Sequence, residues 1–121
     1  SKRDIPVFSH MDGDLKPIWK LIEKSGLKGI DSFSPPPDND TSPGKALEMW
    51  PDMRLFLNFP SSVHLRSEDE IRQTTENILN EAGNSGKLQI QFSENVPPDV
   101  WQKSLPVIAE TINQFGKPEF I

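Results

Sequence analysis

Three polar clusters in this chain contain the side chains best suited to chemistry, and each follows a short apolar run. The first is His10-Met11-Asp12-Gly13, the second begins at Asn58, and the third contains Glu94. Imidazole and carboxylate groups can transfer protons or bind metal ions, and a carboxamide can hold a substrate by hydrogen bonds. The same residue types also cap helices, close Asx turns or remain solvated. Residue types alone leave both interpretations open.

The elements that must position these clusters are four apolar, strand-like runs that alternate with helix-like runs. We expect strands at residues 5–9, 29–33, 53–57 and 88–92. The first, third and fourth strands end at the three polar clusters. Functional residues of parallel α/β folds gather where strands end and helices begin, so these ends form the expected site. Residues 1–121 are expected to form a single α/β domain of four consecutive βα units.

Two of the helices have clear signals in the sequence. Pro17 falls in the first turn of the first helix, and Leu21 and Ile22 belong to its expected apolar face. Ser67 and Glu70 form a capping box before the apolar stripe of the third helix. The third helix is therefore the best-specified element of the chain.

Composition excludes several classes of function. The chain has no cysteine, so it has no disulfide, thiol nucleophile or thiolate metal site. Its net charge is −5 and its basic residues are scattered, which disfavours nucleic-acid binding. No apolar run is long enough to cross a membrane, and we expect no charged-then-apolar leader before the first strand. The expected location is the cytoplasm.

Two architectures fit four βα units. One is an open doubly wound sheet, and the other is half of a closed eight-stranded barrel. A phosphate-binding glycine loop would favour the first, but neither G-x-G-x-x-G nor G-x-x-x-x-G-K-[ST] occurs in the sequence. The pattern alone leaves the choice open.

The chain resembles the C-terminal half of the uroporphyrinogen decarboxylase superfamily, which includes the cobamide-dependent methyltransferases. The segments that carry the likeness are Phe8-Ser9-His10-Met11-Asp12-Gly13, residues 20–31, Leu57-Asn58, and Glu94-Asn95-Val96-Pro97-Pro98. They follow the family's order and span nearly the whole chain. Because the family's fold is a (β/α)8 TIM barrel, the resemblance implies that this chain forms the last four βα units, the C-terminal half of such a barrel.

The likeness is closer to the methyltransferase branch, in which a His-x-Cys pair and a later Cys hold zinc that activates a thiol acceptor. The resemblance implies that His10, Asp12 and Glu94 bind a divalent metal, with zinc as the expected ion. In this set Asp12 and Glu94 stand at the two Cys positions of the family. Asn58 at the third strand end is the candidate catalytic residue, as a group that hydrogen-bonds substrate, and the alternative is an Asx-turn residue. The implied activity is corrinoid-linked methyl transfer, with the corrinoid carried by a partner protein.

Two alternatives remain. The first is decarboxylation of a tetrapyrrole without metal, although Ser93-Glu94 stands where the true decarboxylases carry Gly-His. The second is a non-catalytic α/β module that binds a partner or a small molecule. Metal analysis of the intact parent protein separates the methyltransferase interpretation from the metal-free decarboxylase.

Several other residues have structural interpretations. His64 is expected at the surface of its loop, and Trp19, Trp50 and Trp101 are expected to pack between helices and sheet. Pro106 is expected to divide the last helix into a short turn and a main helix. The prolines at residues 35–37 predict a stiff loop, whose neighbouring acids Asp31, Asp38 and Asp40 are expected to be solvated or to add negative charge at the barrel mouth.

A half barrel has two unpaired strand edges, which favour association with another sheet. The expected partner is an N-terminal half barrel or a second copy of this chain. Alone, one half is expected to be catalytically inactive and to self-associate.

Overall fold

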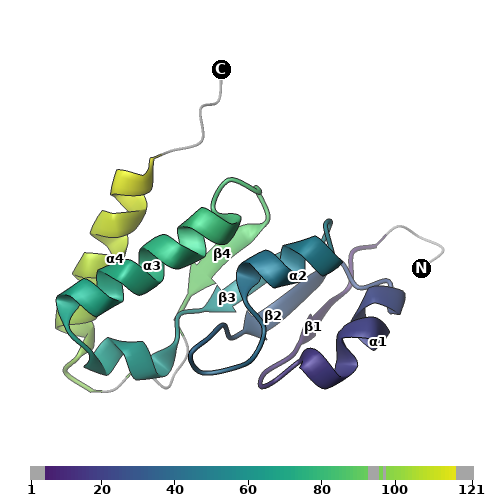
Figure 1. Ribbon diagram of the computed structural model, residues 1–121, viewed down its shortest axis with the longest axis horizontal. Coiled ribbons are helices and arrows are strands. Elements are labelled where there is room, and N and C mark those ends of the chain that lie inside the picture. Colours follow the sequence, from purple (N-terminus) through teal and green to yellow (C-terminus); the bar gives the residue numbers. More distant parts are fainter. Residues whose placement is uncertain (1–4, 93–95, 97, 117–121) are drawn as a thin grey trace.

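The computed structural model describes residues 5–92, 96 and 98–116, in which four parallel strands alternate with four α-helices (Figure 1). The strands pair in the order of the sequence, and all pairings are parallel. They are β1 (Phe8–His10), β2 (Gly29–Phe33), β3 (Arg54–Asn58) and β4 (Leu88–Gln91). The predicted α/β class is confirmed, and the predicted strand bounds agree to within a few residues.

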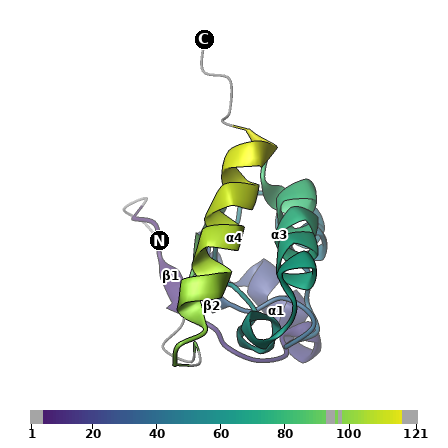
Figure 2. The same cartoon turned by 90° about the vertical axis from the view of Figure 1, so that its left-hand side faces the viewer.

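The helices connect successive strands and lie along one side of the sheet (Figure 2). Since each strand pairs with the next one in sequence, crossovers of one hand place their helices on the same face. After β4 the last helix packs against the third at the end of the row (Figure 1). The helices are the short 3-10 turn η1 (Lys16–Ile18), α1 (Trp19–Lys24), α2 (Pro43–Met49), the 3-10 segment η2 (Ser61–Leu65), α3 (Glu68–Ala82) and α4 (Trp101–Phe115).

The hydrophobic core lies between the sheet and these helices. Ile30, Leu55 and Leu57 are fully buried on the helix side of β2 and β3. Alternate residues point to the other face, where Arg54 and Gln89 are exposed. Parallel sheets are normally covered on both faces. In the described part of this chain, helices cover only one of the two faces of the sheet.

The Ser67 half of the predicted capping box of α3 is present. The Ser67 hydroxyl accepts a hydrogen bond from the backbone N–H of Glu70 at 3.2 Å. Ile71, Thr75 and Ile78 are buried beneath the helix. The Ser67 cap and the apolar stripe both indicate a helix over the same residues. This agreement explains why α3 was predicted well.

Some packing predictions were wrong at the two ends of the sheet. Leu21, expected on the buried face of α1, is 68% exposed, and Trp101, expected to pack under α4, is 50% exposed. Trp50 is buried as expected, and its indole N–H donates to the backbone carbonyl of Trp19 at 3.3 Å. Leu21 and Trp101, whose burial was wrongly predicted, belong to the outermost helices α1 and α4. Each of these helices has a neighbouring helix on one side only.

Pro106 does not divide the last helix, because α4 is continuous from Trp101 to Phe115. A proline in this position removes one backbone hydrogen bond. Ser104 and Ile108, on either side of Pro106, are both buried. Burial on both sides of the proline holds the two parts in one helix. No helix among the described residues is long and apolar enough to span a membrane.

Candidate functional site

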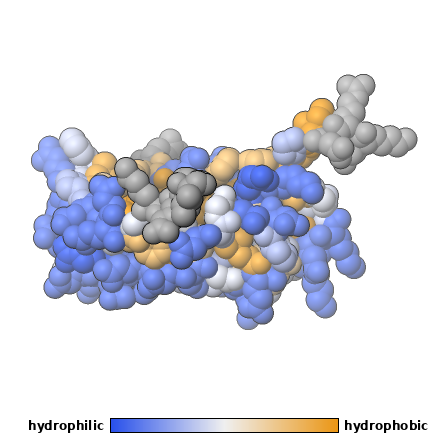
Figure 3. Space-filling model, turned by 90° about the horizontal axis from the view of Figure 1, so that it is seen from above, coloured by the Kyte–Doolittle hydropathy of each residue, from blue (hydrophilic) through white to orange (hydrophobic). Residues whose placement is uncertain are grey.

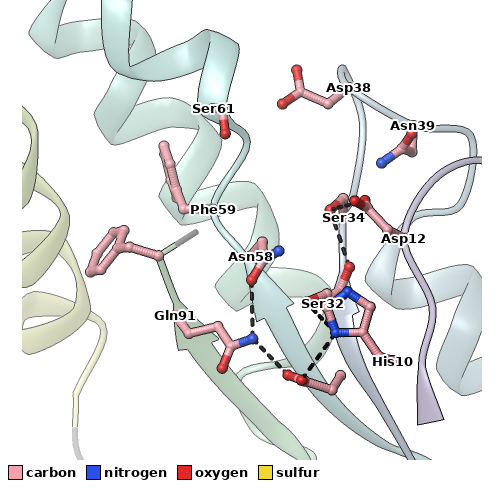
Figure 4. Close-up of a pocket in the computed structure, with 12 residues that line it drawn as sticks. His10, Asp12, Ser32, Ser34, Asp38, Asn39, Asn58, Phe59, Ser61 and Gln91 are labelled. Atoms are coloured by element: carbon pink, nitrogen blue, oxygen red, sulfur yellow. Dashed lines mark hydrogen bonds and ion pairs between the residues drawn. The ribbon is translucent and has the colours of Figure 1, made fainter. Parts of the chain in front are cut away.

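A cavity of about 600 Å³ opens at the carboxyl ends of the strands, and all four strands or the loops that follow them contribute to its walls (Figure 4). His10 and Asp12 enter from the end of β1, and Asn58 enters from the end of β3. These predicted site residues are thus brought together. Glu94, the remaining predicted metal ligand, lies outside the described residues.

His10 is held by two groups from β2. Its Nδ1 lies 3.5 Å from Oδ2 of Asp31 and 3.2 Å from the hydroxyl of Ser32 (Figure 4). Both His10 and Asp31 are partly open to solvent, with side chains 67% and 43% exposed. A carboxylate on Nδ1 fixes the orientation of an imidazole and directs Nε2 toward a proton or a metal ion.

The Ser32 hydroxyl reaches His10 because β2 is irregular at this point. The pairing with β3 shifts between Asp31 and Phe33, and Ser32 has a positive φ of 59°. Such bulges redirect side chains at strand ends, and a positive φ is unfavourable for a residue with a Cβ. Asp31 and Ser32 both line the cavity as a result.

A side-chain amide extends this polar cluster across the sheet. The Gln91 amide nitrogen at the end of β4 donates to Asp31 at 2.9 Å and to the Asn58 side-chain oxygen at 3.0 Å. Residues from β1, β2, β3 and β4 therefore form one network, His10–Asp31–Gln91–Asn58 (Figure 4). We use the name strand-end network for these four residues.

The network favours the ionised form of Asp31. The Gln91 hydrogen bond, helped by the Ser32 backbone and by His10, lowers the pKa of the Asp31 carboxyl below its usual value, while desolvation opposes this effect. The carboxylate is therefore ready to accept a hydrogen bond from the His10 ring when Nδ1 carries the proton.

Asp12 stabilises the turn after β1 and lines the cavity, and it does not cap the first helix. Its Oδ1 accepts a hydrogen bond from the backbone N–H of Gly13 at 2.9 Å, which stabilises the turn after β1. The Ser34 hydroxyl also approaches Oδ1 at 3.5 Å. Gly13 has a φ of +88°, which a residue with a side chain rarely adopts. Asp12 is thus placed in the cavity by the turn that it stabilises.

The loop after β2 contains the prolines at residues 35–37, and its acids connect it to the neighbouring loops. Asp38 accepts hydrogen bonds from the backbone N–H and the hydroxyl of Ser62. Asp40 accepts from the backbone N–H groups of Leu15 and Lys16, at 3.0 and 3.3 Å, and from the hydroxyl of Thr41. Asp38 links the loop after β2 to the loop after β3, and Asp40 links it to the loop after β1. These bonds hold the cavity rim together.

His64 is buried, not at the surface as expected, because its ring packs between aromatic side chains. The ring centroid is 5.0 Å from that of Phe59 and 5.9 Å from that of Phe92, both of which line the cavity. Nδ1 shares a 2.7 Å hydrogen bond with the Ser104 hydroxyl of α4. Nε2 is buried without a hydrogen-bond partner in the described part of the chain. His64 therefore joins the back of the cavity wall to α4.

Sequence reasoning missed Asp31 and Gln91 as members of the network. One signal was present: both are polar residues near the carboxyl ends of their strands, on the face opposite the core. Their partners are 21 residues away or more, so no local pattern could have paired them.

Comparisons with known protein families, curated proteins and solved structures found no match to this chain.

Proposed function

We propose that this chain is the C-terminal half of a (β/α)8 barrel enzyme of the uroporphyrinogen decarboxylase type, and that the cavity is half of its mouth. The sequential strand order supports this proposal, because a doubly wound sheet reverses its order at a switch point. The helices connecting the strands occupy one face, as in a barrel wall. The polar residues lie at the end of the strands where barrel enzymes have their active sites.

The proposed chemistry is corrinoid-linked methyl transfer at a metal held by His10, Asp12 and Glu94. The observation that carries it is the Asp31 carboxylate on His10 Nδ1, an arrangement common behind metal-binding histidines. His10 and Asp12 line the same cavity. Zinc suits imidazole and carboxylate ligands, and when bound it would activate the acceptor as a Lewis acid.

The described residues supply only part of such a site. Within residues 5–92, 96 and 98–116, no three His, Asp, Glu or Cys side chains are grouped closely enough to hold a metal ion. The proposed set therefore depends on Glu94 as the third ligand. A second candidate is a metal-free decarboxylase in which His10 transfers a proton, because the Asp31 carboxylate on Nδ1 also orients an imidazole for proton transfer.

The other members of the strand-end network position the reacting groups. Asp31 orients His10, and Gln91 holds Asp31 by its amide N–H. Asn58 lines the cavity beside Gln91 and has a carboxamide with which to bind substrate. The corrinoid would arrive on a partner protein at the open side of the cavity.

Zinc binding by the purified chain tests the proposal. We expect about one zinc ion per chain by calorimetry and metal analysis, and loss of binding in His10→Ala and in Asp12→Ala with Glu94→Ala. Asp31→Asn should weaken binding by about 10- to 100-fold, since it removes the support of a ligand. The control is Asp52→Asn, an exposed carboxylate in the turn between α2 and β3.

Equal zinc affinity in the wild type and His10→Ala would refute the metal site. No zinc binding by the wild-type chain would also refute it and would favour the metal-free candidate.

A further inference from the structure

Asp31 fixes the direction of the hydrogen bonds in the strand-end network. At neutral pH its carboxylate only accepts hydrogen bonds, so Gln91 must turn its amide nitrogen toward it. The observed bond has this direction, with 2.9 Å between Gln91 Nε2 and Asp31 Oδ1. The opposite orientation would place the Gln91 oxygen against the negative charge of Asp31. The orientation of the Gln91 amide therefore follows from that charge.

Gln91 in turn fixes the orientation of Asn58. Its amide nitrogen also donates to Asn58 Oδ1, at 3.0 Å, so Asn58 must present its oxygen to Gln91. The side-chain nitrogen of Asn58 then points away from Gln91 (Figure 4). Among the described residues, none accepts a hydrogen bond from this nitrogen. Because Asn58 lines the cavity, its two N–H groups are available to a ligand there.

The charge of the cavity decides which kind of acceptor can meet these N–H groups. The described residues that line it include Asp12, Asp31 and Asp38 but neither lysine nor arginine. His10, which also lines it, already faces Asp31. An anionic ligand would lie near these carboxylates without a cation from this chain to offset the repulsion. The acceptor that fits is therefore an uncharged oxygen, not a carboxylate or a phosphate.

An aromatic wall lies beside Asn58. Phe59 and Phe92 both line the cavity, and each directly follows a member of the strand-end network in the chain. The backbone N–H of Phe59 donates to the carbonyl of Gln91 at 2.9 Å, which keeps the two strand ends together. Phe92 is 43% exposed, so its ring is open to contact. A ligand bound to Asn58 can thus pack an apolar group on this wall.

We propose that the cavity binds an uncharged carbonyl compound with an apolar substituent, and that its carbonyl oxygen accepts hydrogen bonds from the Asn58 side chain. A carbonyl oxygen suits this position because it accepts without carrying a donor that would need its own partner. Asn58 contacts the ligand, whereas Gln91 is a positioning residue that acts through Asn58.

The inference rests on the proposed function, because it names the kind of substrate that the methyl-transfer site would hold. A zinc ion held by His10, Asp12 and Glu94 would leave the reasoning unchanged, since its two carboxylate ligands offset its charge. Asp31 and Asp38 would still disfavour an anion. A decarboxylase substrate must carry a carboxylate, so the inference does not extend to the metal-free candidate.

Benzamide and benzoate test the proposal, because they share a phenyl ring and a planar head group but differ in charge at neutral pH. In NMR spectra of the isotope-labelled chain, we expect benzamide to shift the side-chain NH2 signal of Asn58 until it saturates. Benzoate should bind about tenfold more weakly or less, since it brings a negative charge beside the aspartates. The titrations contain EDTA, so the zinc experiment and this one can fail independently.

The NMR signals also separate the cavity from other places where a phenyl ring can bind. Apolar side chains reach the surface elsewhere, as the view from above illustrates (Figure 3). Gln89 lies on β4 outside the described lining of the cavity. Its side-chain NH2 signal should not move with benzamide.

Three substitutions test the roles of the two amides. Asn58→Asp keeps an acceptor for Gln91 but has no N–H to donate, so benzamide should bind about tenfold more weakly. Gln91→Glu places an acceptor beside Asn58, which should turn its N–H groups out of the cavity. This variant should weaken benzamide similarly and shift the Asn58 NH2 signal without ligand. Gln89→Glu, the matched control on the same strand, should bind benzamide like the wild type.

The wild-type titration alone can refute the proposal, so the test does not depend on how the variants fold. An Asn58 signal that does not respond to benzamide, or equal affinities for benzamide and benzoate, would overturn it. Unchanged benzamide binding in a folded Asn58→Asp chain would do the same.

Discussion

The buried His64 ring makes stability depend on pH in a direction that the structure determines. Burial lowers the pKa of His64 below its ordinary value of 6.5, and the charge of Asp38 opposes this effect. Above pH 6.5 the imidazole is mostly neutral in both the folded and the unfolded chain. As pH falls below 6.5, the unfolded chain binds the proton first. The free energy of unfolding therefore decreases until the pH reaches the pKa of the folded state.

The size of the effect has an upper limit. A difference of one bound proton changes the free energy of unfolding by at most about 1.4 kcal/mol per pH unit. Between pH 6.5 and 5 the loss caused by His64 can thus reach about 2 kcal/mol. The orphaned Nε2 makes the charged form costly, since a second ring N–H would be buried without an acceptor among the described residues.

The assay compares the wild type with His64→Phe, which keeps an aromatic ring between Phe59 and Phe92 but cannot titrate. Urea unfolding followed by tryptophan fluorescence gives the free energy of unfolding from pH 5 to 8 at one protein concentration. All other ionisable groups are the same in both proteins, so the difference between the two curves isolates His64. Curves that stay parallel across this range would refute the reasoning.

Two further substitutions test the core and a helix cap. Leu57→Ala should lower the free energy of unfolding by about 2–5 kcal/mol, because Leu57 is fully buried, whereas exposed Leu65→Ala should change it by less than about 0.5 kcal/mol in urea unfolding. Similar losses in both would contradict the described core. Ser67→Ala should cost about 1 kcal/mol by the same measurement, and Ser67→Asp should retain the cap of α3. A Ser67→Ala protein as stable as the wild type would show that the cap contributes little.

Much of the fold could be predicted because its signals are local. The second strand was placed at residues 29–33, and the Ser67 cap was predicted from a four-residue motif. Strand alternation and capping depend on residues within one or two turns of each other. The positions of His10, Asp12 and Asn58 at strand ends followed directly from the strand bounds.

The candidate site could be predicted only in part. His64 was expected at the surface because it lies farther out in its loop than Asn58, but Phe59, Phe92 and Ser104 enclose it. Those contacts span up to 40 residues of sequence. Whether a loop histidine is buried depends on where a distant helix packs, and no local pattern contains that information.

The sequence by itself determined the alternation of strands and helices and the polar residues that end the strands. Only the tertiary structure decided that Gln91 reaches over β3 to Asp31, and that Asp31 in turn holds His10. It also decided which apolar side chains stay uncovered, as Leu21 of α1 does. The reason is physical: periodicity decides which side of an element is apolar, whereas long-range packing decides whether anything covers that side.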